Sequence, residues 1–258
     1  TWMSDMKTPH VTNYRFSSDI TLRKVLEHHP WFGFEMEFFM MDIDTNLPLG
    51  FPTSGESPEQ GKFYCSAGGG RAYGREIIER HYEYCLRAGI NVTGINAEVA
   101  CGQWEYQVMG EGIEVADDAW MTRYILARVC EEFNVYPDWD PKPIPGDCNG
   151  SGMHTNYSTK EMRNPGGIKQ ILEAIDKLEL KHKEHIDVYG AGNHKRLTGQ
   201  HETAPIDKFS WGYGDRGASV RVGYETRLKK CGYLEDRRVA SSCDMYQVVE
   251  RMIKTTLL

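Results

Sequence analysis

The chain has 258 residues, of which 40% are hydrophobic, 11% aromatic and 26% charged. This composition is that of an ordinary globular protein and excludes a mostly disordered chain, because the aromatic residues supply ample apolar surface. The formal net charge of −7 argues against a general nucleic-acid or membrane-surface binder. Seven cysteines without a C-x-x-C spacing indicate free thiols in a reducing compartment, so we expect a cytoplasmic protein.

The predicted elements begin with a lead-in over residues 1–30, which contains a short helical pattern from Ser18 to His28. Three longer amphipathic helices are predicted from the spacing of apolar residues, over Tyr73–Ala88, Asp117–Phe133 and Gly167–Tyr189. Strands and glycine-rich connections are expected between these helices. The strands are the more informative elements, because they carry polar residues where a plain sheet would have apolar ones.

The first such strand is Phe34–Phe38, in which apolar and acidic residues alternate. On a strand, Glu35 and Glu37 project from one face. Two acids on one face repel one another unless a cation lies between them. For this pair alone, a solvated sheet face remains the simpler interpretation.

A second pair of strands is predicted over Asn96–Val99 and Gln103–Val108, with a tight reversal at Cys101-Gly102. Glu98 and Glu105 are embedded there among apolar residues. Burying a bare carboxylate is costly, so these acids together with the earlier pair favour oxygen ligands for a hard divalent cation.

A run of small residues, Asn149–Gly152, follows a proline-rich segment and allows a ligand to approach the backbone closely. His154 comes next. It is either a core histidine with satisfied hydrogen bonds or one nitrogen ligand beside the carboxylates.

The last third of the chain is dense in arginine. A loop-like run starts at Arg196, and a turn leads into a strand near Arg221. Further on, Tyr233, Glu235 and Arg237 share a face if the chain is extended there. Arginine suits recognition of carboxylate and phosphate, although each group alone could be a surface ion pair worth little. The sequence has no P-loop and no nucleophile elbow, so acids, histidine and arginines together indicate metal-assisted phosphoryl transfer.

These residues lie in strings that resemble the eukaryotic-type (class II) glutamine synthetases, from about Thr8 to the end of the chain. The matching strings include Gly94–Val99, Gly102–Gln107, Asp140–Gly146, His154–Thr159, Arg196–Gly199, Arg216–Arg221 and Gly232–Arg238. The resemblance implies an α+β fold with a curved, mostly antiparallel sheet that carries metal ligands and is backed by long helices. It also implies a catalytic domain over residues 31–258, with residues 1–30 leading in from an N-terminal β-grasp domain that is absent from this chain.

The resemblance further implies a role for each site residue. The implied ligands of two divalent metals, Mg²⁺ or Mn²⁺, are Glu37, Glu98 and Glu105 for one and Glu35, His154 and Glu235 for the other. The implied glutamate-binding residues are Arg196, Asn149, Gly150 and Gly152. The implied ATP-binding residues are Arg216, Arg221, Tyr233 and Arg237. The implied catalytic residues are Arg216, Arg221, Arg237 and the flap acid Glu202, which helps to deprotonate ammonium.

The implied reaction is the ATP-dependent ligation of glutamate and ammonia to glutamine through a γ-glutamyl phosphate. The family assembles into a double pentameric ring whose sites are shared between neighbouring subunits, so we expect a homo-oligomer that binds neither nucleic acid nor membrane. Two alternatives stay open: a catalytically silent structural relative, and a ligase that joins glutamate to a larger amine.

Some positions near the site depart from the family pattern. The departures are Met36 and Phe38, Ala100 and Cys101 in place of Met-Pro, Cys148 in place of Trp, and Asp215 in place of Asn. None of them is an implied metal ligand.

Overall fold

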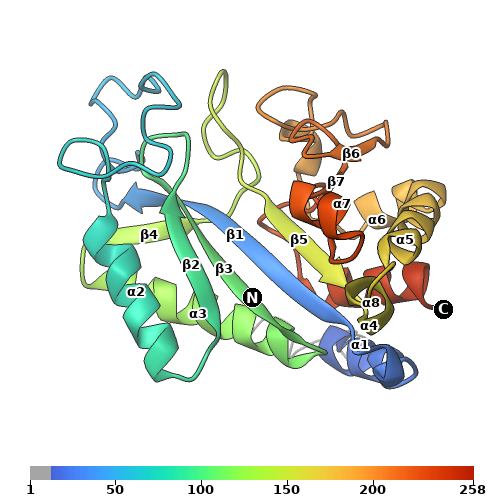
Figure 1. Cartoon of the computed structure of the whole chain (residues 1–258). Helices are drawn as coiled ribbons and strands as arrows, with labels where there is room; N and C mark the ends of the chain where they lie inside the picture. The colour runs from blue at the N-terminus through green and yellow to red at the C-terminus, as the bar shows by residue number, and fades with distance from the viewer. Residues whose placement is uncertain (1–12) are drawn as a thin grey trace.

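An eight-stranded sheet is the frame of the protein in this computed structural model, which describes residues 13–258 (Figure 1). The strand order is β2-β3-β1-β5-β8-β7-β6, and β4 pairs with the far end of β1. Within the described residues the ladders are antiparallel except that of β6 with β7. The strands are β1 (Trp31–Asp42), β2 (Val92–Ala97), β3 (Gln103–Glu111), β4 (Val135–Asp138), β5 (Met153–Ser158), β6 (Trp211–Tyr213), β7 (Val220–Val222) and β8 (Leu234–Asp236).

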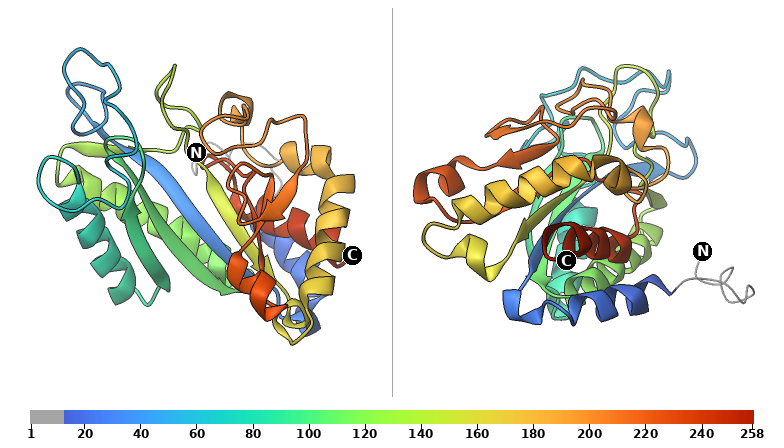
Figure 2. Two further views of the ribbon diagram at one scale, coloured as in Figure 1. Left: turned by 45° about the horizontal axis from the view of Figure 1, so that its top comes forward. Right: turned by 90° about the vertical axis from the view of Figure 1, so that its right-hand side faces the viewer.

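The longer helices gather along one side of this sheet, as the turned views in Figure 2 show. The helices are α1 (Tyr14–Leu22), α2 (Arg75–Arg87), α3 (Glu114–Glu131), α4 (Lys160–Arg163), α5 (Ile168–Leu180), α6 (His182–Ile186), α7 (Tyr224–Lys229) and α8 (Met245–Thr256). Short 3₁₀ turns occupy Leu26–His28 and Asn193–Lys195. None of the helices in the part of the chain described is long and apolar enough to cross a bilayer.

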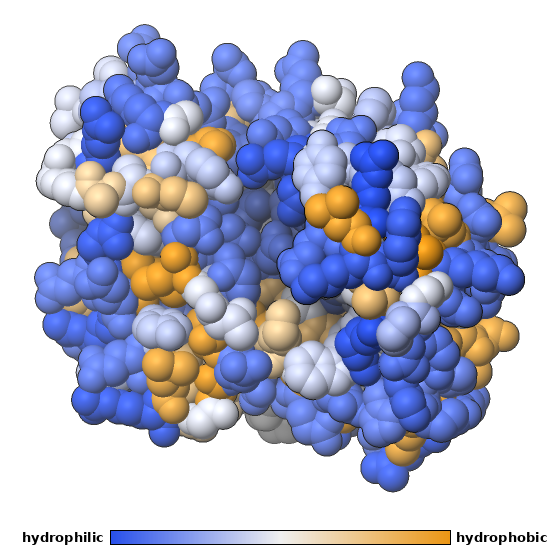
Figure 3. Space-filling view, viewed as in Figure 1, coloured by the Kyte–Doolittle hydropathy of each residue, from blue (hydrophilic) through white to orange (hydrophobic). Residues whose placement is uncertain are grey.

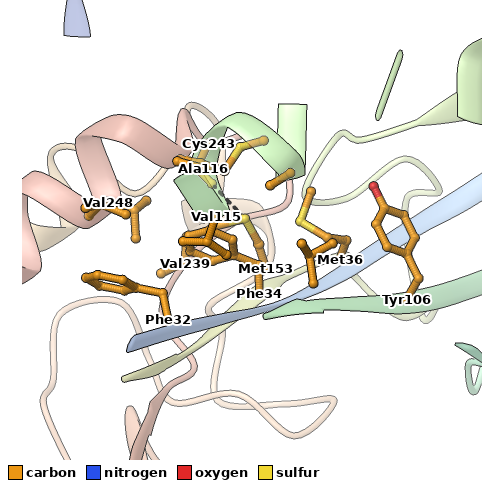
Figure 4. Close-up of a cluster of buried hydrophobic side chains, with 14 of the residues drawn as sticks. Phe32, Phe34, Met36, Tyr106, Val115, Ala116, Met153, Val239, Cys243 and Val248 are labelled. Atoms are coloured by element: carbon orange, nitrogen blue, oxygen red, sulfur yellow. Dashed lines mark hydrogen bonds between the residues drawn. The ribbon is translucent and has the colours of Figure 1, made fainter. Parts of the chain in front are cut away.

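The core lies between the sheet and these helices. From β1 the side chains of Phe34, Met36 and Phe38 are fully buried in it, because alternate residues of a strand point to opposite faces. Val239 and Met153 pack in the same cluster, under α3 and α8 (Figure 4). The other face of β1 is therefore left free to carry Glu35 and Glu37.

The expected α+β class with a mostly antiparallel, helix-backed sheet is confirmed. The predicted helix over Gly167–Tyr189 is wrong in one respect, because it is interrupted after Leu180. Lys181 has φ −106° and ψ 15°, outside the helical region, and the next residue, His182, turns to contact the carbonyl of Ile206. Apolar spacing continues across the break, so periodicity alone could not locate it.

The predicted helix over Ser18–His28 is likewise two elements, α1 and the 3₁₀ turn at Leu26–His28. α1 packs against α8. The first part of the predicted lead-in, residues 1–12, lies outside the described residues, so the domain boundary at residue 30 stays a prediction.

Candidate active site

The register of the sheet brings the predicted metal ligands together on the face opposite the core. Glu37 pairs with Glu105 of β3, and Glu35 pairs with His154 of β5. Glu235 lies on β8, the next strand beyond β5. Because directly paired residues point to the same face, side chains from four strands converge on one side of the sheet.

A cavity of about 1020 Å³ opens over this face, and the space-filling view shows a hollow flanked by hydrophilic residues (Figure 3). The loops at the top of Figure 1 surround it, after β1, before β5 and before β6. The predicted site residues in its wall are Glu35, Glu37, Glu98, Glu105, Asn149, Gly150, His154, Arg196, Glu202, Arg216, Arg221 and Arg237. Of the other predicted residues, Glu235 is buried behind the wall, Gly152 is buried beneath it, and Tyr233 is half exposed.

One group of possible ligands converges closely within residues 13–258. Ligand atoms of Glu35, His154 and Glu235 all lie within 4.8 Å of one another. His154 Nδ1 is 3.3 Å from Glu35 Oε2 and 3.6 Å from Glu235 Oε1. Burial, together with the nearby charge of Arg237, holds the pKa of His154 well below its usual value. The imidazole is therefore neutral, which is the form that binds a metal.

The remaining acids, Glu37, Glu98 and Glu105, are each less than a tenth exposed. Burial and the charge of Glu105 raise the pKa of Glu37 to about 8. Burial and the charge of Glu35 raise the pKa of Glu105 to about 7. Burial, then Glu37 and Glu105, raise the pKa of Glu98 well above its usual value. These carboxylates destabilise one another when they are charged.

Among the described residues, none of these three acids forms an ion pair with lysine or arginine. Together with Glu35, Glu235 and His154 they offer five carboxylates and one imidazole to the site. This mainly hard oxygen set fits Mg²⁺ or Mn²⁺, whose charge would relieve the mutual repulsion. The residues present therefore fit the implied metals.

Amide side chains that the sequence analysis did not single out hold the acids in place. Asn96 Nδ2 donates to Glu98 Oε1 at 3.2 Å and to Glu105 Oε2 at 2.9 Å. Gln107 donates to Asn96 Oδ1 and so fixes the orientation of that amide. The sequence could have pointed to Asn96, because it precedes Glu98 by two residues and so shares a face with it on the predicted strand Asn96–Val99.

The arginines approach the acids from the other side of the cavity. Glu235 forms an ion pair with Arg221 Nε and accepts a hydrogen bond at 2.6 Å from Arg237 Nη1. Arg237 Nε also donates to the carbonyl of Arg216. Two guanidinium groups thus flank one predicted metal ligand.

Arg196 is a buried cation without an ion pair in the part of the chain described. Its Nη2 donates to the carbonyls of Arg237 and Val239, both at 3.0 Å, and its Nε to Asn193 Oδ1 at 3.3 Å. Burial lowers its pKa to about 10, which leaves it charged at neutral pH. A charged group held by neutral acceptors beside a cavity is suited to an anionic ligand.

Glu202 reaches across the mouth of the cavity and pairs with Arg216 at 3.0 Å. Arg216 also lies over the ring of Tyr64. His201 and Glu202 have φ of 51° and 58°, in the left-handed region that non-glycine residues seldom adopt. His201 Nε2 lies 3.0 Å from Asp147 Oδ1 on the facing loop.

The loop at Asn149–Gly152 is held by Gln103, which the sequence analysis also missed. Gln103 Nε2 donates to the carbonyl of Gly150 at 2.9 Å, and Gln103 Oε1 accepts from Asn149 Nδ2 at 3.0 Å. The sequence could have pointed to Gln103 because it is a glutamine at the start of a strand whose neighbouring residues are buried. Cavity-lining residues that were also missed are Gln60, Tyr64, Lys142 and Lys195.

Comparison with known proteins identifies the family to which this fold and this site belong. The family model for the glutamine synthetase catalytic domain matches residues 20–166. Glutamine synthetase cytosolic isozyme 1-2 of Oryza sativa subsp. japonica is 51% identical, over 99% of this chain and 74% of the relative. The cytosolic isozyme of Chlamydomonas reinhardtii is 52% identical, over 97% of this chain and 66% of the relative.

The chain belongs to the glutamine synthetase family. It spans between about two thirds and three quarters of the length of these relatives. A cryo-EM structure of Plasmodium falciparum glutamine synthetase has the same fold, with a TM-score of 0.78 at 19% identity, over 94% of this chain and 54% of that one. The resemblance expected from the sequence is confirmed.

Proposed function

We propose that the protein is an ATP-dependent ligase that joins glutamate and ammonia into glutamine through a γ-glutamyl phosphate. The observation that carries this proposal is the convergence, in one cavity, of an acid–histidine cluster and a set of arginines. Identity of about half to proteins named glutamine synthetase supports it.

Glutamate would bind at Arg196 and the Asn149–Gly152 loop. Arg196 meets a carboxylate without losing an existing ion pair, because its present partners are two backbone carbonyls and an amide. Gln103 fixes the loop through Asn149 and Gly150, so the loop needs little reordering to receive the substrate.

The phosphates of ATP would lie between the acid cluster and Arg216, Arg221 and Arg237, with Tyr233 nearby. When bound, Mg²⁺ or Mn²⁺ would supply charge neutralisation to the phosphates, held by the ligand sets Glu35–His154–Glu235 and Glu37–Glu98–Glu105. The arginines stabilise the negative charge of the transferring phosphoryl group.

Glu202 is the proposed proton acceptor for ammonium. Its carboxylate is half exposed at the mouth of the cavity and is paired with Arg216. When Arg216 turns to a phosphate, the carboxylate of Glu202 is released and can accept a proton. Acyl phosphate and ammonia then meet under this loop, out of bulk water.

We further propose that the protein acts in the cytosol as a homo-oligomer of the double-ring type, with sites completed by a neighbouring subunit. Relatives named cytosolic isozymes support the location. Because this chain covers only part of the length of its relatives, the assembly is to be measured on the full-length protein by sedimentation.

The test is ATP-dependent product formation from glutamate with ammonium, and in parallel with methylamine and ethylamine. We expect glutamine from ammonium, and a loss of about a thousandfold or more in Arg221→Leu. Arg128→Leu is the matched control, since Arg128 is exposed and, within residues 13–258, forms an ion pair with Glu131 alone. Product from the larger amines alone would support the second ligase, and no product from any amine would support a silent relative.

A further inference from the structure

Ser241 is a fully buried serine whose three polar groups each bind a different part of the site's framework. Its hydroxyl donates to the carbonyl of Glu37 at 2.5 Å. Its backbone N–H donates to the carbonyl of Ser151 at 3.1 Å. Its own carbonyl accepts from Arg123 of α3. The resemblance to the glutamine synthetases implies no role for Ser241.

The hydroxyl of Ser241 satisfies a carbonyl that the sheet leaves without a strand partner. The ladder of β1 with β5 ends at the pair Met36–Met153, and β1 pairs with β4 only from Phe39 onward. Glu37 lies in the gap, and its N–H still reaches the carbonyl of Gly152 at 3.1 Å. The carbonyl of Glu37 points to the same edge of β1 as its N–H. It accepts a hydrogen bond from the Ser241 hydroxyl instead of from a neighbouring strand.

These contacts close a ring through the substrate loop. Gly152 N–H donates to the carboxylate of Glu37 at 2.8 Å. Ser151 precedes Gly152 and accepts from Ser241, which in turn donates to Glu37. The ring therefore joins a predicted metal ligand to the predicted glutamate loop, and a change at one is transmitted to the other.

The segment that carries Ser241 is rigidly held on both sides. Figure 4 shows Val239 and Cys243 embedded in the core beside Met153 and Met36. The carbonyl of Val239 accepts from Met153 N–H and from Arg196 Nη2. Because the hydroxyl of Ser241 is held in place, it fixes the position of the Glu37 backbone. The position of the Glu37 carboxylate is fixed in turn.

We propose that Ser241 is a positioning residue, which holds Glu37 and the glutamate loop in one arrangement so that metal and glutamate bind together. This inference rests on the proposed function, because it assigns Glu37 to a metal. Loss of an outer partner of a metal ligand weakens metal binding by about tenfold to a hundredfold.

The test is a titration of the full-length protein with Mn²⁺, read by electron paramagnetic resonance, with and without glutamate and without ATP. In Ser241→Ala we expect one Mn²⁺ equivalent to bind about tenfold more weakly and the other, at His154, to change less than twofold. Glutamate should tighten Mn²⁺ binding to the wild type, and it should no longer do so in this variant.

The matched control is Ser242→Ala, since Ser242 is exposed and its hydroxyl also donates to a carbonyl, that of Ala191. If Ser241→Ala does not fold, Ser241→Cys supplies a weaker donor of similar size, with an expected loss of about threefold. A folded variant with unchanged Mn²⁺ affinity, or with both equivalents equally weakened, would overturn the proposal. Absence of Mn²⁺ binding by the wild type would instead refute the proposed function.

Discussion

Asp236 and Arg238 form a two-point ion pair in the core, on the face of β8 opposite the cavity. Arg238 Nε donates to Asp236 Oδ1 at 2.9 Å, and Arg238 Nη2 to Asp236 Oδ2 at 2.6 Å. Both side chains are essentially unexposed. The pair interleaved with it, Glu235 with Arg237, lies on the cavity side, where Arg237 is part of the cavity wall. The two acids of β8 and the two arginines that follow it therefore form one ion pair on each side of the sheet, one for the fold and one for the site.

Removing one partner of the core pair should destabilise the protein strongly. Asp236→Asn leaves the guanidinium of Arg238 buried without a counter-charge, and we expect a loss of about 3–5 kcal/mol in the free energy of unfolding. Urea denaturation measures this, with Asp176→Asn, an exposed change on α5, as the control. A loss below about 1 kcal/mol would show that the pair contributes little.

His185 is linked to this ion pair through the hydroxyl of Tyr189, which donates to Asp236. This histidine should make the free energy of unfolding depend on pH. His185 donates or accepts at Tyr189 Oη and Thr255 Oγ1, and burial lowers its pKa from 6.5 to about 3. Between pH 3 and pH 6.5 this histidine is protonated in the unfolded chain but not in the folded protein. The stabilising contribution of neutral His185 is therefore complete above pH 6.5. It falls by up to about 1.4 kcal/mol per pH unit as the pH drops toward 3.

The pH effect is checked by urea denaturation of the wild type and of His185→Gln between pH 4 and 7. We expect a flatter profile for His185→Gln than for the exposed control His194→Gln. Identical slopes for the two variants would contradict the assignment to His185.

Neutralising one acid of the cavity should separate stability from metal binding. In the metal-free protein Glu37→Gln removes a carboxylate that burial and Glu105 disfavour, so we expect the melting temperature to stay equal or rise. The rise in melting temperature that Mn²⁺ causes in the wild type should be largely lost. Differential scanning calorimetry measures both, with the exposed Glu173→Gln as the control. A lower melting temperature without metal, or an unchanged response to Mn²⁺, would argue against the metal site.

Glutamate recognition should separate from phosphate recognition. Arg196→Leu removes a charge-assisted contact worth about 1.5–3 kcal/mol, so the KM for glutamate should rise about tenfold to a hundredfold with the KM for ATP little changed. Arg196→Lys should recover only part, because a point charge does not reproduce the guanidinium fork. Steady-state kinetics with each substrate varied provides the measurement; a normal glutamate KM with weakened ATP binding would reverse the assignment.

Sequence periodicity predicted much of the arrangement, but not its registers. The alternation at Phe34–Phe38 was enough to place Glu35 and Glu37 on one face. That Glu37 lies opposite Glu105 depends on strand pairing across about 70 residues of chain, which no local pattern encodes. The break at Lys181 depends on a distant contact of His182 with Ile206.

The supporting residues were the hardest to predict. Ser241 is one serine in a short polar run, and its importance arises only because Glu37 lies where β1 leaves β5. Asn96 could have been found from its place on the face of Glu98. The acidic ligands could be predicted from the sequence, because burying a carboxylate is costly and an acid among apolar residues therefore needs an explanation. A buried hydroxyl or amide gives no such signal in the sequence.

The most direct test of the central claim is the fate of ¹⁸O placed in the γ-carboxylate of glutamate. Attack of that carboxylate on ATP, followed by displacement by ammonia, transfers one carboxylate oxygen to the released phosphate. Incubation of the full-length protein with glutamate labelled at both γ-carboxylate oxygens, ATP, ammonium and Mg²⁺ should therefore give one ¹⁸O in each inorganic phosphate, measured by mass spectrometry, together with an equal amount of glutamine that keeps the other ¹⁸O. Unlabelled phosphate accompanying glutamine would contradict the acyl phosphate route.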